Sequence, residues 1–404
     1  MKKLFALILS AVLLIVFVLP VSAKTVSTEY TGADLDTPLE ENLQANAAIG
    51  ERLSINAKAA ILIEYNTGKV LYEMNPDEKL APASITKVMS LILVMEAIEE
   101  GKISLDTKVT ASEHAASLGG SQIWLEPGEV MTIDELLKAT VIASANDATV
   151  ALAEAVAGSE ESFVAMMNEK ARALGLENTN FVNSYGLDAD GHLTTAHDVA
   201  IMSAELIKHP LIREYSSIRM DSLRGGESEL VNTNKLIRYY DGCFGLKTGT
   251  TGKAGSCLTA TAERNGLTLI AVVLGAPNSN DRFSGTQKLL DYGFANYSFV
   301  NVEPDTQGIR TIPVKKGVEK SVMPTATENL PLLLKKGDEK KITQSISLNE
   351  ELTAPIRKGD VVGYVHVYLE NEEIGVIEII ASNDVEKLTF FVCFSRLVKG
   401  LFTL

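Results

Sequence analysis

Cysteine, histidine and positive charge are all scarce in this chain of 404 residues, and each scarcity excludes a class of protein. Three cysteines are too few for a disulfide-stabilised scaffold. The five histidines form no cluster with cysteine at zinc-site spacing, so we expect no metal and no cofactor. Lysine and arginine number 37 against 52 acidic residues, and a net charge of -15 argues against a nucleic-acid partner.

Long hydrophobic runs are also rare, and the one that is present lies at the N-terminus. Two lysines precede an apolar stretch over 4–19, and a proline and small residues follow it up to Ala23. This pattern predicts a secretory signal peptide over 1–23, with an uncleaved anchor as the alternative because the run is slightly long. The polar stretch 24–55 is then expected to form a flexible leader on an exported protein.

The pattern of apolar residues beyond the leader predicts an α/β (α+β) domain over 56–297. The expected strands are 60–65, 69–73, 246–248, 256–262 and 267–274. The expected helices are 82–100, 133–157, 160–174, 198–208 and 284–297. Early strands, a helical middle and late strands together indicate an antiparallel sheet with a helical subdomain.

The composition changes after Tyr297. Short alternating segments separated by Lys-Gly, Gly-Asp and Glu-Asn turns predict a small all-β domain over 298–383, in which we recognise no chemistry. The final segment, 384–404, contains a helix-like pattern with phenylalanine, leucine and valine on one side and threonine, serine, arginine and lysine on the other. It is too short and too charged to span a bilayer comfortably. We therefore expect an amphipathic helix that anchors the protein to a membrane surface, with docking on the β-domain as the alternative.

The first chemical motif is Ser84-Ile85-Thr86-Lys87, at the start of an expected helix. A serine hydroxyl is a weak nucleophile and needs a base nearby, and residues three apart on a helix share a face. Lys87 can act as that base if burial or a neighbouring cation removes its proton. The free backbone N–H groups of a first helical turn can also stabilise developing negative charge. Alone, Ser-x-x-Lys is a weak signal.

Two further motifs follow along the chain. Ser144-Ala145-Asn146 is one of three Ser-x-Asn sequences, and a helix cap or turn is the simpler interpretation of it alone. Lys247-Thr248-Gly249 occurs once, on an expected edge strand. There Lys247 and Thr248 can hold a carboxylate, while Gly249 leaves room for a substrate along the strand. Ordinary solubilising residues are the alternative for this pair.

The three motifs together, in this order, are those of penicillin-binding proteins and class A β-lactamases. The stretches 81–89, 144–148, 232–236 and 245–251 resemble the low-molecular-mass penicillin-binding proteins, specifically the serine-type D-alanyl-D-alanine carboxypeptidases. The resemblance covers about residues 55–390. It implies a β-lactamase-like catalytic domain that acts on a peptidoglycan stem peptide ending in D-Ala-D-Ala, and β-lactam antibiotics as acylating inhibitors.

The resemblance also implies a role for each motif residue. Ser84 is the nucleophile, Lys87 accepts its proton, and Ser144 assists proton transfer to the leaving D-alanine. The implied substrate-binding residues are Asn146, Lys247, Thr248, Gly249 and Thr250. The backbone N–H groups of Ser84 and Thr250 form the implied oxyanion hole. The protein is then expected at the extracytoplasmic face of the cytoplasmic membrane.

Two further polar residues stay outside this set. A structural hydrogen bond in a loop is the favoured interpretation of His192. Arg282 is either a second clamp for the substrate carboxylate or a surface residue. Neither is assigned a catalytic role.

Other activities of the same superfamily remain open at this point. A β-lactamase would share the motifs, but none of the glutamates between Asn146 and Lys247 lies in the Glu-x-x-Leu-Asn pattern that such enzymes use for deacylation. A D,D-endopeptidase or transpeptidase differs only in leaving group or acceptor. A non-catalytic penicillin-binding scaffold would be expected to lack one of the chemical residues, and all of them are present.

Overall fold

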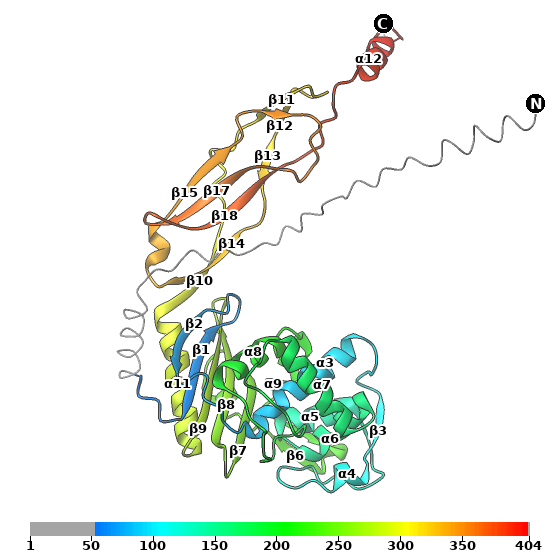
Figure 1. The fold of residues 1–404 in the computed structure, drawn as a ribbon, viewed down its shortest axis with the longest axis vertical. Helices are drawn as coiled ribbons and strands as arrows, with labels where there is room; N and C mark the ends of the chain where they lie inside the picture. Colours follow the sequence, from blue (N-terminus) through cyan, green and yellow to red (C-terminus); the bar gives the residue numbers. More distant parts are fainter. Residues whose placement is uncertain (1–52, 403–404) are drawn as a thin grey trace, which may run out of the picture. The chain divides into compact units, whose positions relative to one another are not determined.

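The computed structural model describes residues 53–402 (Figure 1). The predicted signal peptide over 1–23, most of the predicted leader and the last two residues lie outside the described residues. The first strand begins at Ala59, close to the predicted start of the folded chain.

A five-stranded antiparallel sheet with the order β2-β1-β9-β8-β7 lies at the centre of the catalytic domain. Its strands are β1 (Ala59–Glu64), β2 (Val70–Met74), β7 (Cys243–Thr251), β8 (Gly255–Arg264) and β9 (Leu267–Ala276). The predicted pairing of early with late strands is therefore confirmed. Because β7 is an edge strand, the backbone of one of its sides is free to meet a substrate.

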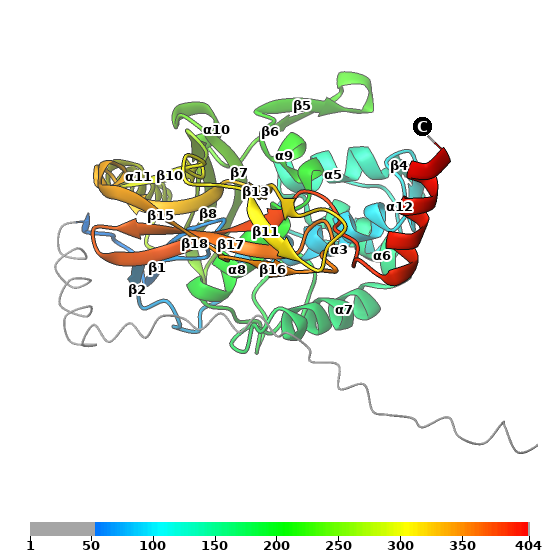
Figure 2. The same ribbon diagram turned by 90° about the horizontal axis from the view of Figure 1, so that it is seen from above.

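Side chains that alternate along the strands divide the core of this domain into two layers. Figure 2 shows the ribbon of the same domain from above. Ile61 and Val272 belong to the layer that contains α3 and α8, whereas Leu62 and Val273 belong to the layer that contains α11. The helices are α3 (Lys87–Glu99), α4 (Glu113–Ala116), α5 (Ile133–Ile142), α6 (Asn146–Ala157), α7 (Glu160–Ala173), α8 (Ala196–Leu206), α9 (Pro210–Ser216), α10 (Leu236–Tyr239) and α11 (Ser279–Asn296). Two small hairpins accompany them: β3 (Lys108–Thr110) with β4 (Val130–Thr132), and β5 (Met220–Leu223) with β6 (Ser228–Val231).

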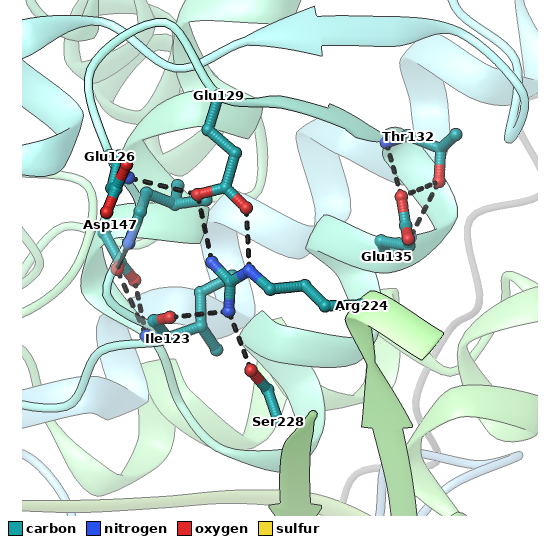
Figure 3. Close-up of polar contacts among 9 residues, drawn as sticks. Ile123, Glu126, Glu129, Thr132, Glu135, Asp147, Arg224 and Ser228 are labelled. Carbon is teal, nitrogen blue, oxygen red and sulfur yellow. Dashed lines mark hydrogen bonds and ion pairs between the residues drawn. The ribbon is translucent and has the colours of Figure 1, made fainter. Parts of the chain in front are cut away.

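The prediction of one continuous helix over 133–157 was wrong. The chain forms α5 and α6 instead, because Ser144 adopts a left-handed backbone (φ 63) and Ala145 is extended. Both helices begin in a well-defined way: Thr132 and Glu135 form a capping box at the start of α5 (Figure 3), and Asn146 is the first residue of α6. The break takes Ser144 out of helical geometry, and its buried side chain contacts Lys247 on the edge strand.

A separate all-β domain follows, as predicted. Its strands are β10 (Tyr297–Val302), β11 (Ile312–Lys315), β12 (Ser321–Val322), β13 (Pro324–Ala326), β14 (Leu330–Lys335), β15 (Ile342–Leu348), β16 (Leu352–Thr353), β17 (Val361–Leu369) and β18 (Glu372–Ala381). The largest sheet, β13-β18-β17-β15, is antiparallel and buries Val365, Val367 and Ile379 in a core of its own.

The C-terminal segment contains α12 (Phe390–Phe402), within the stretch where an amphipathic helix is expected. Three phenylalanines on it are largely exposed: Phe390, Phe391 and Phe394 are 77%, 80% and 57% accessible. Within residues 53–402, no helix combines the length and the apolar character needed to cross a membrane.

Candidate active site

Ser84 and Lys87 lie together where the chain enters α3. Ser84 is in a short 3-10 turn, Ala83–Thr86, and Lys87 is the first residue of the α-helix. Lys87 Nζ is 3.1 Å from Ser84 Oγ. The contact expected from residues three apart is therefore present, although the first turn is tighter than an α-helix.

Lys87 is fully buried, and two acceptors surround its amine. Its Nζ donates to Asn146 Oδ1 at 2.6 Å and to the Tyr185 carbonyl oxygen at 2.7 Å. Burial, followed by the charge of Lys247, holds the pKa of Lys87 well below its usual value. A neutral amine has two N–H groups, which these acceptors occupy. Its lone pair is then directed at Ser84 Oγ.

A second lysine meets the Ser-x-Asn motif from the edge strand. Lys247 Nζ on β7 donates to Ser144 Oγ at 2.8 Å and to the Thr248 carbonyl oxygen at 3.0 Å. Burial and then the neighbouring Arg282 charge lower the pKa of Lys247 to about 7. The structure thus forms two hydrogen-bonded sets, Ser84 with Lys87 and Asn146, and Ser144 with Lys247, and the charge of Lys247 acts on Lys87.

Asn146 is held by the loop between α4 and β4. Its Nδ2 donates to the Gly119 carbonyl oxygen at 2.7 Å, and its backbone N–H donates to the Ser121 carbonyl oxygen at 2.7 Å. With the amide nitrogen engaged in this way, the amide oxygen is turned toward Lys87.

The next residue, Asp147, fixes the same loop. Its buried carboxylate accepts hydrogen bonds from the backbone N–H groups of Ile123 and Leu125, as Figure 3 shows for Ile123. Arg224, on the turn of the β5–β6 hairpin, donates to the Ile123 carbonyl oxygen and makes a two-bond ion pair with Glu129. The loop is therefore tied both to α6 and to the hairpin.

Gly249 lies directly against the nucleophile turn. A Cβ at this position would come within 2.9 Å of both Ala83 Cβ and Ser84 N. The glycine is thus required by the close approach of β7 to Ser84, which is a different reason from the substrate space expected from the sequence.

Thr248 and Thr250 lie on either side of Gly249. The Thr248 hydroxyl donates to Thr233 Oγ1 at 2.7 Å, and the Thr250 hydroxyl donates to the Gly249 carbonyl oxygen at 2.8 Å. On β7, Lys247 contacts Ser144 and Gly249 packs on the turn of Ser84, whereas the hydroxyls of Thr248 and Thr250 bond to Thr233 and to β7 itself.

Arg282 is a buried residue, so the surface interpretation of it was wrong. From α11 its Nη1 donates to the Gly249 carbonyl oxygen at 3.0 Å and to Thr250 Oγ1 at 2.9 Å. It thus stabilises the backbone of β7 behind the site.

His192 makes the structural hydrogen bonds that were expected of it. Its Nδ1 accepts from the Val182 backbone N–H at 2.9 Å, so Nε2 carries the proton and donates to Thr86 Oγ1 at 2.7 Å. Thr86 Oγ1 in turn donates to the Ala83 carbonyl oxygen. Burial lowers the pKa of His192 to about 4, which keeps the ring neutral. This chain of bonds supports the turn that carries Ser84.

Several residues of the site were not found from the sequence. The Tyr185 carbonyl is a backbone group and has no sequence signal of its own. Asp147 directly follows the Ser-x-Asn motif, and that position is the one signal that could have identified it. Arg224 and Glu129 are far apart in the sequence and carry no motif. The three cysteines, Cys243, Cys257 and Cys393, are all free.

Comparison with known proteins gives consistent matches over both domains. A family model described as D-alanyl-D-alanine carboxypeptidase matches residues 44–278, and one for the C-terminal domain of penicillin-binding protein 5 matches residues 300–387. The D-alanyl-D-alanine carboxypeptidase DacF of Bacillus subtilis is 44% identical over 348 residues, which cover 85% of this chain and 90% of that protein.

Solved structures agree with these relatives. Penicillin-binding protein 5 from Haemophilus influenzae superposes with a TM-score of 0.70 at 32% identity, covering 82% of this chain and 98% of that chain. Penicillin-binding protein D2 from Listeria monocytogenes, in its ampicillin-bound form, has a TM-score of 0.53 at 34% identity and covers 59% of this chain and 98% of that one. The chain therefore belongs to the D-alanyl-D-alanine carboxypeptidase family of low-molecular-mass penicillin-binding proteins, and it is a serine-type carboxypeptidase of peptidoglycan.

Proposed function

We propose that Ser84 is the nucleophile and Lys87 the base of this carboxypeptidase. Ser84 Oγ attacks the carbonyl carbon of the penultimate D-alanine while its proton passes to the neutral Lys87 amine. The lowered pKa of Lys87 supports this role, because it favours the neutral amine, which is the form that can accept a proton. The Asn146 and Tyr185 oxygens hold the amine in the orientation needed for transfer.

Ser144 is the proposed relay to the leaving group. Its hydroxyl accepts a hydrogen bond from Lys247, so its own proton is free to be donated to the nitrogen of the departing D-alanine. The proton that Lys87 took from Ser84 replaces it, so Lys247 keeps its charge and Lys87 is neutral again for the attack of water. Water then attacks the acyl-enzyme, releases the shortened stem peptide and restores Ser84.

β7 supplies the proposed binding groups for the substrate. Lys247 and Thr248 hold the terminal carboxylate, and Asn146 accepts a hydrogen bond from the substrate backbone or orients it. The backbone N–H groups of Ser84 and Thr250 form the proposed oxyanion hole, and the close packing of Gly249 on Ser84 supports this, because it brings the two backbones together.

The observations that carry this proposal are the bonds that join Ser84, Lys87 and Asn146, and the separate bond from Lys247 to Ser144. The Listeria protein named above was solved with ampicillin, and we propose that β-lactams acylate Ser84 here in the same way as substrate. The test is incubation with a fluorescent penicillin and peptide mapping of the adduct. Labelling of Ser84 in the wild type and none in Ser84→Ala is expected, and a label on another serine would refute the assignment.

We further propose that residues 1–23 are removed on export and that residues 384–404 hold the enzyme at the outer surface of the cytoplasmic membrane. The exposure of three phenylalanines on α12 supports this, since aromatic side chains favour the membrane interface. We also propose domain boundaries at 56–297 and 298–383, with the chemistry in the first domain and the second as a spacer or interaction module.

The anchor is tested with anionic phospholipid vesicles. The full chain is expected to sediment with them, whereas a variant with Phe390, Phe391 and Phe394 changed to serine is expected to remain in solution. Both proteins should release D-alanine from a soluble pentapeptide at the same rate. Equal sedimentation of the two would contradict membrane anchoring by this face.

A further inference from the structure

Trp124 is the single tryptophan of the chain, and its side chain is 77% exposed. Large aromatic side chains usually contribute their area to a core. Trp124 also has a left-handed backbone, with φ 60, which is unfavourable for any residue with a Cβ. The fold therefore places this indole in solvent at a cost in both backbone conformation and lost burial.

The backbone on both sides of Trp124 is firmly held. The N–H groups of Ile123 and Leu125 donate to the buried Asp147 carboxylate, at 3.1 to 3.2 Å for Ile123 and 3.1 Å for Leu125. Arg224 Nη1 donates to the Ile123 carbonyl oxygen at 2.9 Å (Figure 3). The Ile123 and Leu125 side chains are buried, each with 5% accessible. The backbone of the loop is therefore fixed at this point, and it holds the Trp124 indole in solvent.

This rigid loop also borders the site. The carbonyl oxygens of Gly119 and Ser121 accept hydrogen bonds from the side chain and backbone of Asn146, and Asp147 follows Asn146 directly. A substrate that reaches Asn146 therefore comes close to this loop. The reacting end of the substrate is the stem peptide, and this peptide is attached to a sugar of the glycan strand.

The residues that precede Trp124 favour an uncharged polar occupant. The four residues from Gly119 to Gln122 carry no charge, and no polar contact is recorded for the Ser121 hydroxyl or the Gln122 amide among residues 53–402. An exposed aromatic face, preceded in the chain by a serine hydroxyl and a glutamine amide, matches a sugar ring, whose C–H groups stack on the face and whose hydroxyl and acetamido groups hydrogen-bond. A protein partner would need a contiguous apolar patch, which one indole among glycine, serine and glutamine does not provide.

We propose that Trp124 is a binding platform for an N-acetylated sugar ring of the glycan strand that carries the stem peptide. This rests on the proposed function of the adjacent site. The platform gives glycan-linked stem peptides an affinity that free peptides lack, and it acts in binding rather than in bond cleavage.

The first test uses the tryptophan itself as the reporter. Because the chain has one tryptophan, its intrinsic fluorescence reports on this position alone. Titration of the full-length Ser84→Ala enzyme with N-acetylglucosamine oligomers is expected to give a saturable change in emission. The absence of any change at millimolar oligomer would overturn the proposal, whether or not the wild type releases D-alanine.

The second test separates a sugar contact from a merely structural role. Trp124→Leu is expected to raise KM for a disaccharide-pentapeptide roughly tenfold, while kcat for it and both constants for the free pentapeptide stay unchanged. Trp124→Phe keeps an aromatic face and serves as the matched control, with KM within about threefold of the wild type. Equal losses on both substrates, or no loss on either, would overturn the platform. Failure of the wild type to cleave either substrate would instead refute the proposed function.

Discussion

Replacing Gly249 with alanine tests the close approach of β7 to the nucleophile turn. The added Cβ would lie 2.9 Å from Ala83 Cβ, 2.9 Å from Ser84 N and 3.1 Å from the Pro82 carbonyl oxygen. None of these atoms belongs to a flexible side-chain end, so either β7 or the turn must move. Overpacking of this kind costs about 1–3 kcal/mol of stability. A displacement of roughly 1 Å at the reacting atoms lowers the rate on the order of 100-fold.

The assay is the rate of acylation by a fluorescent penicillin, measured beside thermal unfolding. Gly252→Ala is the matched control, because a Cβ on that glycine, at the turn between β7 and β8, meets nothing within 4 Å. We expect Gly249→Ala to lose most of its acylation rate and Gly252→Ala to keep it. Wild-type acylation by Gly249→Ala, with an unchanged unfolding midpoint, would refute the packing argument.

Three further predictions concern charge and hydrogen bonding. Lys247 must be charged to hold a carboxylate and loses its proton as pH rises. The alkaline fall in kcat/KM should therefore disappear in Lys247→Arg, as a pH–rate profile would show. The folded pKa of His192, about 4, lies below its usual 6.5, so the unfolded chain binds the proton first and stability falls as pH drops through that window. Urea unfolding should show a loss of about 2 kcal/mol between pH 7 and pH 5 that His192→Asn does not share. Arg224→Met should cost about 1–3 kcal/mol, because it leaves the carboxylate of Glu129 without its two-bond partner. Lys102→Met, which removes an exposed ion pair, should cost less than about 1 kcal/mol in the same unfolding assay.

The sheet and the motif positions could be predicted from sequence because each depends on a local pattern. The apolar run 267–274 by itself predicts the buried strand β9. The spacing of three residues between Ser84 and Lys87 by itself predicts their contact. The signal peptide and the membrane anchor proposed for the two ends rest on composition, and the first of them lies outside the described residues.

The remaining features depend on contacts between distant parts of the chain. The break at Ser144 was missed because its neighbours Ala143 and Ala145 suit a helix, and the left-handed backbone is fixed by tertiary contacts such as the bond from Lys247. The contact of Lys87 with the Tyr185 carbonyl involves a backbone atom 98 positions away, for which no residue type is a signal. Burial of Arg282 likewise depends on how α11 packs behind β7.

The central proposal is that Ser84, with Lys87 as its base, removes D-alanine from the stem peptide. The direct measurement is D-alanine released from a disaccharide-pentapeptide by the wild type, Ser84→Ala and Lys87→Met, each first shown to unfold at a similar temperature. We predict steady release by the wild type and loss of at least roughly 1,000-fold in both variants. Release by Ser84→Ala at a rate near that of the wild type would contradict the account.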